Sequence, residues 1–151
     1  MFVRPVSNPT ARQRIVVAAA VIEREERFFV TRRQRGVHLE GYWEFPGGKC
    51  ERGESLHDCL RRELLEELGV VVSVGSEILS VAHEYPDRAV ELHFIACELA
   101  GMPQPLLGQE MRWVARNELR DLRFPSADEA LIALLQGSQE IRRPGEEFHS
   151  S

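Results

Sequence analysis

The sequence is poor in cysteine and has no long apolar run. Its cysteines are Cys50, Cys59 and Cys97, an odd number without CxxC spacing, which argues against a disulfide framework and against a zinc site. No apolar run approaches the roughly 20 residues that cross a membrane. The alanine-rich run Ile15–Ile22 follows several arginines, as in a signal peptide, but charged residues 23–27 and a second apolar run come directly after it. Two such runs around a polar turn predict a β-hairpin.

Positive charge is also in deficit. The chain of 151 residues has 19 Lys and Arg against 24 Asp and Glu, a net charge of −5, so it has no overall attraction for nucleic acid or for an anionic membrane. We expect neither as a partner. If the protein handles phosphates, local basic side chains or bound divalent cations must offset the repulsion.

The length of the chain predicts a single domain. We assign residues 1–137 to it, with an irregular arm over about 1–12, and expect residues 138–151 to be a disordered polar tail. Three cysteines without a pairing pattern favour a reducing, cytoplasmic location.

Strand-like segments alternate with two helices. The strand-like segments are residues 15–22, 27–33, 70–74, 77–85, 89–99 and 111–115. The first helix begins after the N-cap candidate Ser55 and stops at Gly69. The second begins at a capping box of Ser126 and Glu129 and runs to Leu135. This order predicts an α/β or α+β domain built in layers.

The first helix breaks its own apolar pattern. Leu56, Cys59 and Leu60 share one face, as a core-facing stripe should. The next positions on that stripe are acidic: Glu63, Glu66 and Glu67. Like charges at this spacing repel, and a divalent cation such as Mg²⁺ or Mn²⁺ would compensate them. A solvent-exposed acidic face with Arg61 and Arg62 as counterions is the alternative.

The loop before the helix favours the metal site. Gly47, Gly48 and Lys49 precede Glu51 and Glu54, and a glycine turn presents free backbone groups next to the helix. The segment is no Walker A loop, because its glycine spacing is absent and a cysteine follows the lysine.

One sequence pattern in this region resembles the motif of a known family. The pattern Gly48-x5-Glu54-x7-Arg62-Glu63-Leu64-x-Glu66-Glu67-x-Gly69-Val70 matches the box of the Nudix hydrolases at every defined position. Similarity to the MutT-type branch, which cleaves nucleoside triphosphates, extends to residues 31–33, 43–49, 85–88 and 124–128. The resemblance covers about residues 14–136. It implies a mixed β-sheet between helices, with the box as loop–helix–loop.

The resemblance also implies a reaction and its metal. Water would attack phosphorus in a nucleoside triphosphate and release a nucleoside monophosphate and pyrophosphate. The implied ligands of Mg²⁺, or of Mn²⁺, are the Gly48 carbonyl and the side chains of Glu63, Glu66 and Glu67. Glu54 and Arg62 would support these ligands from nearby. The metal would activate water and neutralise charge that develops on the phosphates.

The general base is left open by the resemblance. Many relatives carry a glutamate six residues before the tryptophan that corresponds to Trp113, but Leu107 occupies that position here. Either Glu110, the nearest acid, acts from a shifted loop, or a box glutamate such as Glu63 is the base.

Recognition of the substrate is also implied by the resemblance. MutT-type relatives stack the base on aromatic side chains and read its edge with an amide or carboxylate before the last helix. The corresponding substrate-binding candidates are Arg33, His38, Phe45, Lys49, Tyr85, Arg88 and Asp128. Each aromatic candidate has core packing as its alternative role.

Asp128 leaves the identity of the base open. An ionised aspartate only accepts hydrogen bonds, so it suits the amino group of cytosine or the N1–H and 2-amino edge of guanine. The donor–acceptor face of 8-oxoguanine requires a protonated aspartate. Sanitation of 8-oxo-dGTP and hydrolysis of CTP, dCTP or 5-methyl-dCTP are therefore both open. ADP-ribose or another dinucleotide as substrate, and a nucleotide-binding domain without catalysis, are the remaining alternatives. We expect a monomer or a homodimer.

Overall fold

The computed structural model describes residues 13–137. The expectations for the arm over residues 1–12 and the tail over residues 138–151 lie outside the described part. The elements are β1 (Gln13–Arg24), β2 (Arg27–Arg32), β3 (Trp43–Glu44), β4 (Gly47–Lys49), α1 (Leu56–Leu68), β5 (Val71–Glu84), β6 (Arg88–Ala100), β7 (Met111–Ala115), the 3₁₀ helices η1 (Arg116–Asp121) and η2 (Ser126–Asp128), and α2 (Glu129–Gly137).

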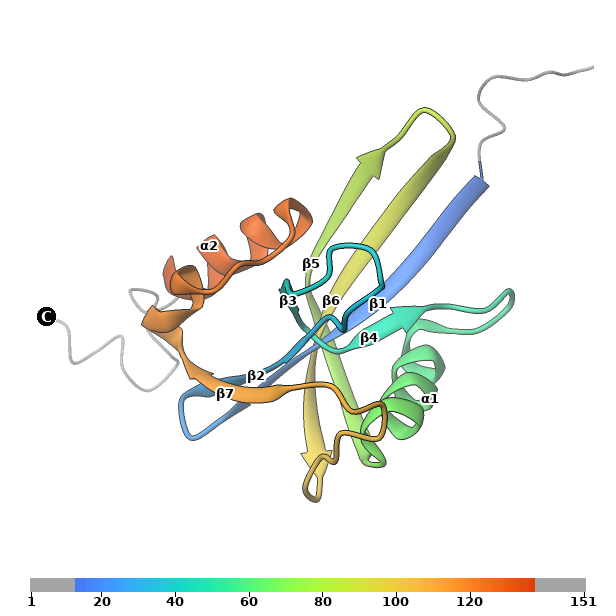
Figure 1. Ribbon diagram of the computed structural model, residues 1–151. Helices are drawn as coiled ribbons and strands as arrows, with labels where there is room; N and C mark the ends of the chain where they lie inside the picture. Colours follow the sequence, from blue (N-terminus) through green and yellow to red (C-terminus); the bar gives the residue numbers. More distant parts are fainter. Residues whose placement is uncertain (1–12, 138–151) are drawn as a thin grey trace, which may run out of the picture.

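The strands form a mixed sheet that divides along β1. The order is β3-β2-β1-β6-β5, with β4 paired to β1 and β7 paired to β2. β1 and β6 are parallel, and β1 pairs with β2 only beside their turn, through Glu23–Phe28 and Arg24–Arg27. Farther along, β1 pairs with β4 instead. In Figure 1, α1 and α2 lie on opposite sides of the strands, so the expected α+β fold with a sheet between helices is confirmed.

β1 is the central strand and has both of its sides buried. Ala18, Ala20 and Ile22 pack in the cluster that contains the apolar side chains of α1. Ala19 and Val21 pack in the second cluster, which contains Phe28, Phe94 and the buried leucines of α2. Side chains of a strand alternate between faces, so two cores on two faces explain why this segment is continuously apolar.

The limits of α1 agree with the sequence. The Ser55 hydroxyl accepts a hydrogen bond from the Asp58 amide at 3.0 Å, as an N-cap does. Gly69 takes the left-handed conformation with φ of 62°, and its amide donates to the Leu65 carbonyl.

Two details differ from the sequence-based expectation. Segments 70–74 and 77–85 are one strand, β5, whose pairing with β6 continues through register shifts between Val74 and Leu79. Gly75-Ser76 therefore marks a bulge and not a chain break. Ser126 does not cap an α-helix but begins η2, in which the Asp128 amide donates to the Pro125 carbonyl. α2 starts only at Glu129.

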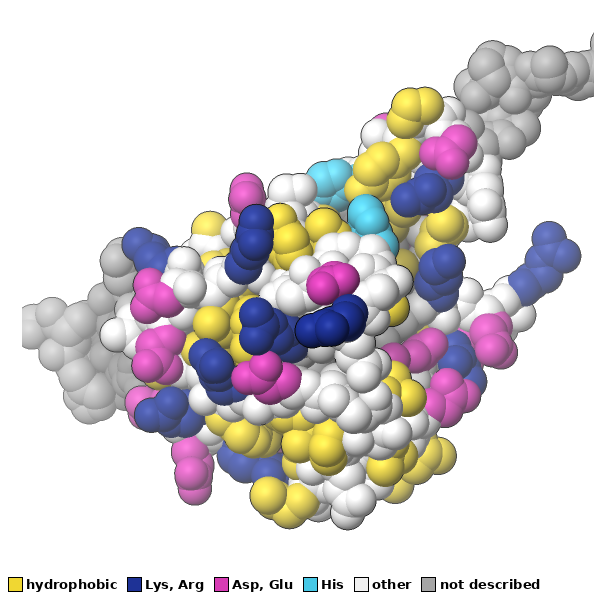
Figure 2. Space-filling model, in the orientation of Figure 1, with side chains coloured by type: hydrophobic (Ala, Val, Ile, Leu, Met, Phe, Trp, Pro, Cys, Tyr) yellow, Lys and Arg dark blue, Asp and Glu magenta, His cyan; other side chains and the backbone are white. Residues whose placement is uncertain are grey.

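The surface and the cysteines follow the composition. All three cysteines are free, as expected. Figure 2 shows basic and acidic side chains interspersed on one face of the molecule. Within residues 13–137, no helix is long and apolar enough to cross a membrane.

Candidate active site

Two glycines bring the backbone of β4 against its neighbours. A Cβ atom on Gly47 would lie 2.0 Å from the Ala18 carbonyl oxygen, and one on Gly48 would lie 2.4 Å from Cδ of Glu63. Neither approach is possible for another residue type without displacement. The Glu63 carboxyl group therefore lies directly against the backbone of Gly48. The Cys59 thiol contacts the Gly48 carbonyl at 3.6 Å.

Arg62 fixes the loop that precedes the helix. Its Nε and one terminal nitrogen donate to the two carboxylate oxygens of Glu54 at 2.7 and 3.0 Å, and the same terminal nitrogen donates to the Lys49 carbonyl at 3.0 Å. This two-pronged contact is the strong form of an arginine–carboxylate pair. The hydrogen bonds from Arg62 lower the pKa of Glu54 to about 2, and the carboxylate in turn raises the pKa of the guanidinium.

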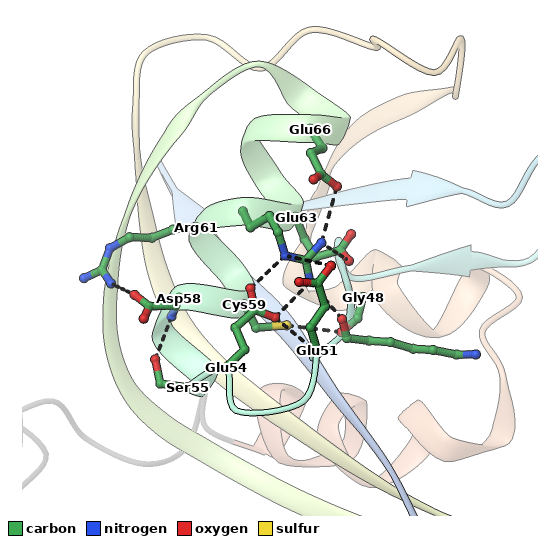
Figure 3. A network of polar contacts seen from close by, with 11 residues as sticks. Gly48, Glu51, Glu54, Ser55, Asp58, Cys59, Arg61, Glu63 and Glu66 are labelled. Atoms are coloured by element: carbon green, nitrogen blue, oxygen red, sulfur yellow. Dashed lines mark hydrogen bonds and ion pairs between the residues drawn. The ribbon is translucent and has the colours of Figure 1, made fainter.

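The other side of Arg62 contacts the acidic stripe. Its second terminal nitrogen lies 3.1 Å from Glu63 and 3.4 Å from Glu66. Figure 3 shows Glu54, Glu63 and Glu66 gathered on one side of the helix, while the pair of Asp58 with Arg61 lies away from them. One guanidinium thus donates hydrogen bonds to three carboxylates, from α1 and from the loop before it, and pairs with a fourth, Glu51, at 3.8 Å.

Glu67 has a different environment. Burial, a hydrogen bond with Glu63 and the negative charges of Glu63, Glu44 and Glu66 raise its pKa to about 9. A carboxyl group with this pKa carries a proton at neutral pH. The acidic stripe therefore has one end that Arg62 neutralises and one end where acids face one another.

A cavity of about 400 Å³ opens where β1 and β2 part. Its volume is in the range of small-molecule sites. Its walls come from β1, β4, β6, β3 with the residue that follows it, η2 and the loop over residues 33–42. Seven residues expected at the site line it: Arg33, His38, Phe45, Gly48, Lys49, Glu67 and Asp128. The cavity thus extends from the helix that carries the acidic stripe to the start of the last helix.

Asp128 and Glu44 place two acids in this cavity. Asp128 is 6% exposed, and burial, followed by the charge of Glu44, raises its pKa to about 7. Burial also raises the pKa of Glu44, against the effect of the Arg33 guanidinium, which donates to it at 2.8 Å. Asp128 therefore binds or releases a proton near neutral pH.

Comparison with known proteins agrees with this geometry. The family described as NUDIX domain matches residues 17–134. The chain belongs to the Nudix family. It is 35% identical over 126 residues to the "8-oxo-dGTP diphosphatase" of Escherichia coli K12, covering 82% of this chain and 98% of the relative.

Two further relatives cover most of the Nudix chain. The "CTP pyrophosphohydrolase" of Escherichia coli K12 is 36% identical over 129 residues, which are 85% of this chain and 93% of that protein. The solution structure of the E. coli ORF135 protein superposes with a TM-score of 0.79 at 30% identity and covers 93% of this chain and 99% of that one. The likeness thus extends over both the box helix and the last helix.

The donor set of the Nudix box fits a divalent cation. Carboxylate and carbonyl oxygens are the ligands that Mg²⁺ and Mn²⁺ prefer, and Glu63 and Glu67 share a hydrogen bond in which a proton takes the role of a cation. Within residues 13–137, no three acidic, histidine or cysteine side chains are already grouped at metal-binding spacing. Glu63 and Glu66 bond to Arg62.

Seven expected site residues do not line the cavity. Four of them form the network around Arg62 beside Gly48, namely Glu54, Arg62, Glu63 and Glu66, and the other three lie elsewhere. Tyr85 lies in the turn between β5 and β6 and Arg88 is the first residue of β6, and the Arg88 guanidinium lies 4.9 Å from the Tyr85 ring centroid. Neither lines the cavity, and Figure 1 shows the turn at the far end of β5 and β6. Glu110 is 3.2 Å from Arg32 and 3.6 Å from Arg112, with its side chain about half exposed, and it does not line the cavity either.

Two residues with a place at the site were missed from the sequence. Glu44 lies between Glu67 and Asp128 and acts on the pKa of both. A carboxylate between the buried aromatics Trp43 and Phe45 was the signal that could have identified it. Gln109 is buried and donates to the Glu67 carbonyl at 3.1 Å, a long-range contact that nothing in the local sequence indicates.

Phe45 packs in the core and also faces the cavity. It is 4% exposed, stacks on Phe124 at 5.4 Å and meets Phe94 edge to face at 6.1 Å. It also lines the cavity. One aromatic side chain thus belongs to the core and to the wall of the site.

Proposed function

We propose that the protein is a divalent-cation-dependent pyrophosphohydrolase of nucleoside and deoxynucleoside triphosphates that clears oxidised guanine nucleotides such as 8-oxo-dGTP. The products would be a nucleoside monophosphate and pyrophosphate. The observation that carries the proposal is that a single cavity is lined both by Phe45 and Asp128 and by Gly48 and Glu67. A base and a polyphosphate joined by a sugar need both groups of residues in one cavity.

The polyphosphate end would hold the metal. Mg²⁺, or Mn²⁺, would bind to Glu63, Glu66, Glu67 and the Gly48 carbonyl. When bound, it supplies charge neutralisation for the phosphates and lowers the pKa of a water molecule. Arg62 and Glu54 would keep the loop and helix at fixed separation. Lys49 and Arg33 would supply positive charge to the phosphates, since both line the same cavity as Glu67.

Glu63 is the better placed of the two candidate bases. Its side chain is 14% exposed and bonded to Arg62 beside the acidic stripe, whereas Glu110 is bonded to two surface arginines. We therefore assign the general base to Glu63.

The base end would recognise 8-oxoguanine through a protonated Asp128. A neutral carboxyl group both donates and accepts, and a pKa of about 7 makes this form abundant at neutral pH. Phe45 and His38 complete this end of the cavity. The relatives named 8-oxo-dGTP diphosphatase support this choice.

Hydrolysis of CTP, dCTP or 5-methyl-dCTP is the second candidate. The relative named CTP pyrophosphohydrolase supports it, and the ionised form of Asp128, which is also present near pH 7, would accept a hydrogen bond from the cytosine amino group. The two candidates thus differ in the protonation state of one side chain.

A substrate panel tests the proposal. The purified protein is incubated with Mg²⁺ and with 8-oxo-dGTP, dGTP, dCTP, 5-methyl-dCTP, CTP or ADP-ribose, and pyrophosphate, orthophosphate and monophosphates are measured. We expect pyrophosphate and 8-oxo-dGMP to form in equal amounts, with 8-oxo-dGTP turned over fastest. Release of orthophosphate from triphosphates, preference for ADP-ribose, or binding without turnover would each reject it.

The proposal includes a setting for the enzyme. We infer a single catalytic domain that acts in the cytoplasm as a monomer or homodimer on free nucleotides, without nucleic acid or membrane as a partner.

A further inference from the structure

Two glutamines connect the loops over residues 33–42 and 101–110 to the box helix. Gln34 follows β2, and its Nε2 donates to the Leu107 carbonyl at 2.6 Å. The Leu107 amide donates to Oε1 of Gln109 at 3.0 Å, and Nε2 of Gln109 donates to the Glu67 carbonyl at 3.1 Å. A continuous series of hydrogen bonds therefore runs from Gln34 to the backbone of Glu67.

Gln109 attaches the loop over residues 101–110 to the end of α1. It is 8% exposed, and both of its amide atoms are bonded, as expected for a buried polar side chain. The carbonyls in the last turn of a helix have no partner within it. Backbone amides of the same loop bond to this turn as well, from Gln104 to Leu68 at 2.9 Å and from Leu106 to Glu67 at 3.2 Å.

Gln34 attaches the loop on the substrate side. It is exposed and belongs to the loop over residues 33–42, which brings Arg33 and His38 to the cavity. A second cavity of about 150 Å³ lies between the two loops and is lined by Gln34, Leu107, Gln109, Arg33, Glu44 and Glu67. Because the last three of these also line the larger cavity, the two cavities adjoin at the ion pair of Arg33 with Glu44.

We propose that Gln34 and Gln109 are positioning residues that hold the loop over residues 33–42 against the last turn of α1. They would thereby keep this wall of the nucleotide cavity at a fixed position relative to Glu67. The idea rests on the proposed function. Gln34 bonds through the substrate-side loop, so loss of its donor should weaken substrate binding more than it slows the reaction. Gln109 bonds to the backbone of a proposed metal ligand, so its loss should lower kcat.

Substitutions at Gln34 separate the donor from the shape of the side chain. Gln34→Met keeps the length and removes the N–H, and we expect KM for the preferred triphosphate to rise about fivefold while kcat stays within about twofold. Gln34→Lys retains an N–H donor of similar reach and should restore KM to within about twofold of the wild type. Gln104→Met is the matched control, because Gln104 meets α1 through its backbone amide, and we expect no change.

A readout without substrate accompanies the kinetics. The Leu107 amide bonds to Gln109, so its hydrogen exchange reports the connection in the protein alone, and Gln34→Met should speed this exchange about fivefold. For Gln109→Met we expect kcat to fall about tenfold. If that variant does not fold, the Gln34 series and the exchange rates decide.

Several results would overturn the inference. An unchanged KM in Gln34→Met, no rescue by Gln34→Lys, or a parallel fall of kcat and Tm in Gln34→Met would show that the contact is only structural. If the wild-type protein hydrolyses none of the triphosphates, the proposed function fails. Leu107 exchange that is unchanged in Gln34→Met would then reject the connection independently.

Discussion

Glu54 precedes α1 and Glu67 lies in its last turn, and the protein shifts their pKa values in opposite directions. The pKa of Glu54 falls to about 2 because Arg62 donates to both of its oxygens, and that of Glu67 rises to about 9 because it is buried among acids. The first end of the box is a completed ion pair in the protein alone. At the second end, Glu67 carries a proton at neutral pH and shares a hydrogen bond with Glu63.

The difference shows how one short segment serves two purposes. Arg62 joins the helix to the Lys49 carbonyl and to Glu54, so the geometry of the loop does not depend on a ligand. Glu67 is left where a carboxylate is unfavourable unless a cation arrives. Within the box, Glu54 therefore serves the fixed geometry of the loop, whereas Glu67 is left for the proposed cation. Glu63 and Glu66 combine both roles, because they bond to Arg62 and are also proposed ligands.

Removal of an acid from the second end should have the largest effect. Glu67→Gln is expected to lower kcat at least about 100-fold, since a metal ligand contributes several kcal/mol to the transition state. Steady-state kinetics with Mg²⁺ and circular dichroism measure the loss of turnover with the fold retained. Normal hydrolysis by this variant would contradict the metal assignment.

The same substitution should change how stability depends on pH. The folded protein keeps the Glu67 proton up to a pKa of about 9, against an ordinary value of 4.5, while the unfolded chain loses it. The metal-free wild type therefore loses stability as pH rises from about 4.5 to 9. Urea unfolding in EDTA should find Glu67→Gln more stable than the wild type at pH 8, with the difference vanishing near pH 4. A stability difference independent of pH would contradict the shifted pKa.

Weakening the contact of Arg62 with Glu54 should lower activity to an intermediate extent. Arg62→Lys loses the paired donors that hold Glu54, and we expect kcat/KM to fall about 10- to 100-fold, as for groups that orient metal ligands. Arg61→Lys is the control, because Arg61 contacts only the exposed Asp58 in the interactions of residues 13–137. Equal losses of kcat/KM in the two variants would show that Arg62 has no specific role in supporting the site.

Base preference should change with pH to a smaller extent. Protonated Asp128 favours 8-oxoguanine and ionised Asp128 favours cytosine, so the ratio of kcat/KM for 8-oxo-dGTP over dCTP should fall as pH rises through about 7. In Asp128→Asn the ratio should be constant, because an amide does not titrate in this range. A wild-type ratio independent of pH between 6 and 8.5 would separate Asp128 from base recognition.

The smallest effects are expected outside the cavity. Glu110→Gln and Tyr85→Ala should each leave kcat/KM within about twofold, because surface ion pairs and exposed side chains contribute little. A loss of about 100-fold in Glu110→Gln would instead identify it as the general base. It would also show that the loop over residues 101–110 moves during the reaction.

Local chemistry made the box helix predictable. Ser55 and Gly69 determine its limits through caps that involve only nearby backbone groups, and the replacement of apolar positions by Glu63, Glu66 and Glu67 is visible in one sequence. The fold class followed from the order of elements and from the resemblance to the family.

Non-local pairing made other features unpredictable. The Gly75-Ser76 step looks like a chain break, but pairing with β6 continues across it. The unbroken hairpin places Tyr85 at its tip, beyond the cavity that we expected it to line. The place of Gln109 at the site was unpredictable for a related reason. Its partner, the Glu67 carbonyl, belongs to a helix that is distant in the sequence.

Because Gly48 lies directly against Glu63, a single added methyl group should be enough to stop catalysis. A single methyl group at residue 48 would occupy the space of the Glu63 carboxyl, while the nucleoside end of the cavity, around Asp128 and Phe45, would be untouched. Gly48→Ala should therefore yield a protein that captures its nucleotide and keeps it intact. Such a variant would allow the natural ligand to be recovered from cell extract and identified by mass spectrometry.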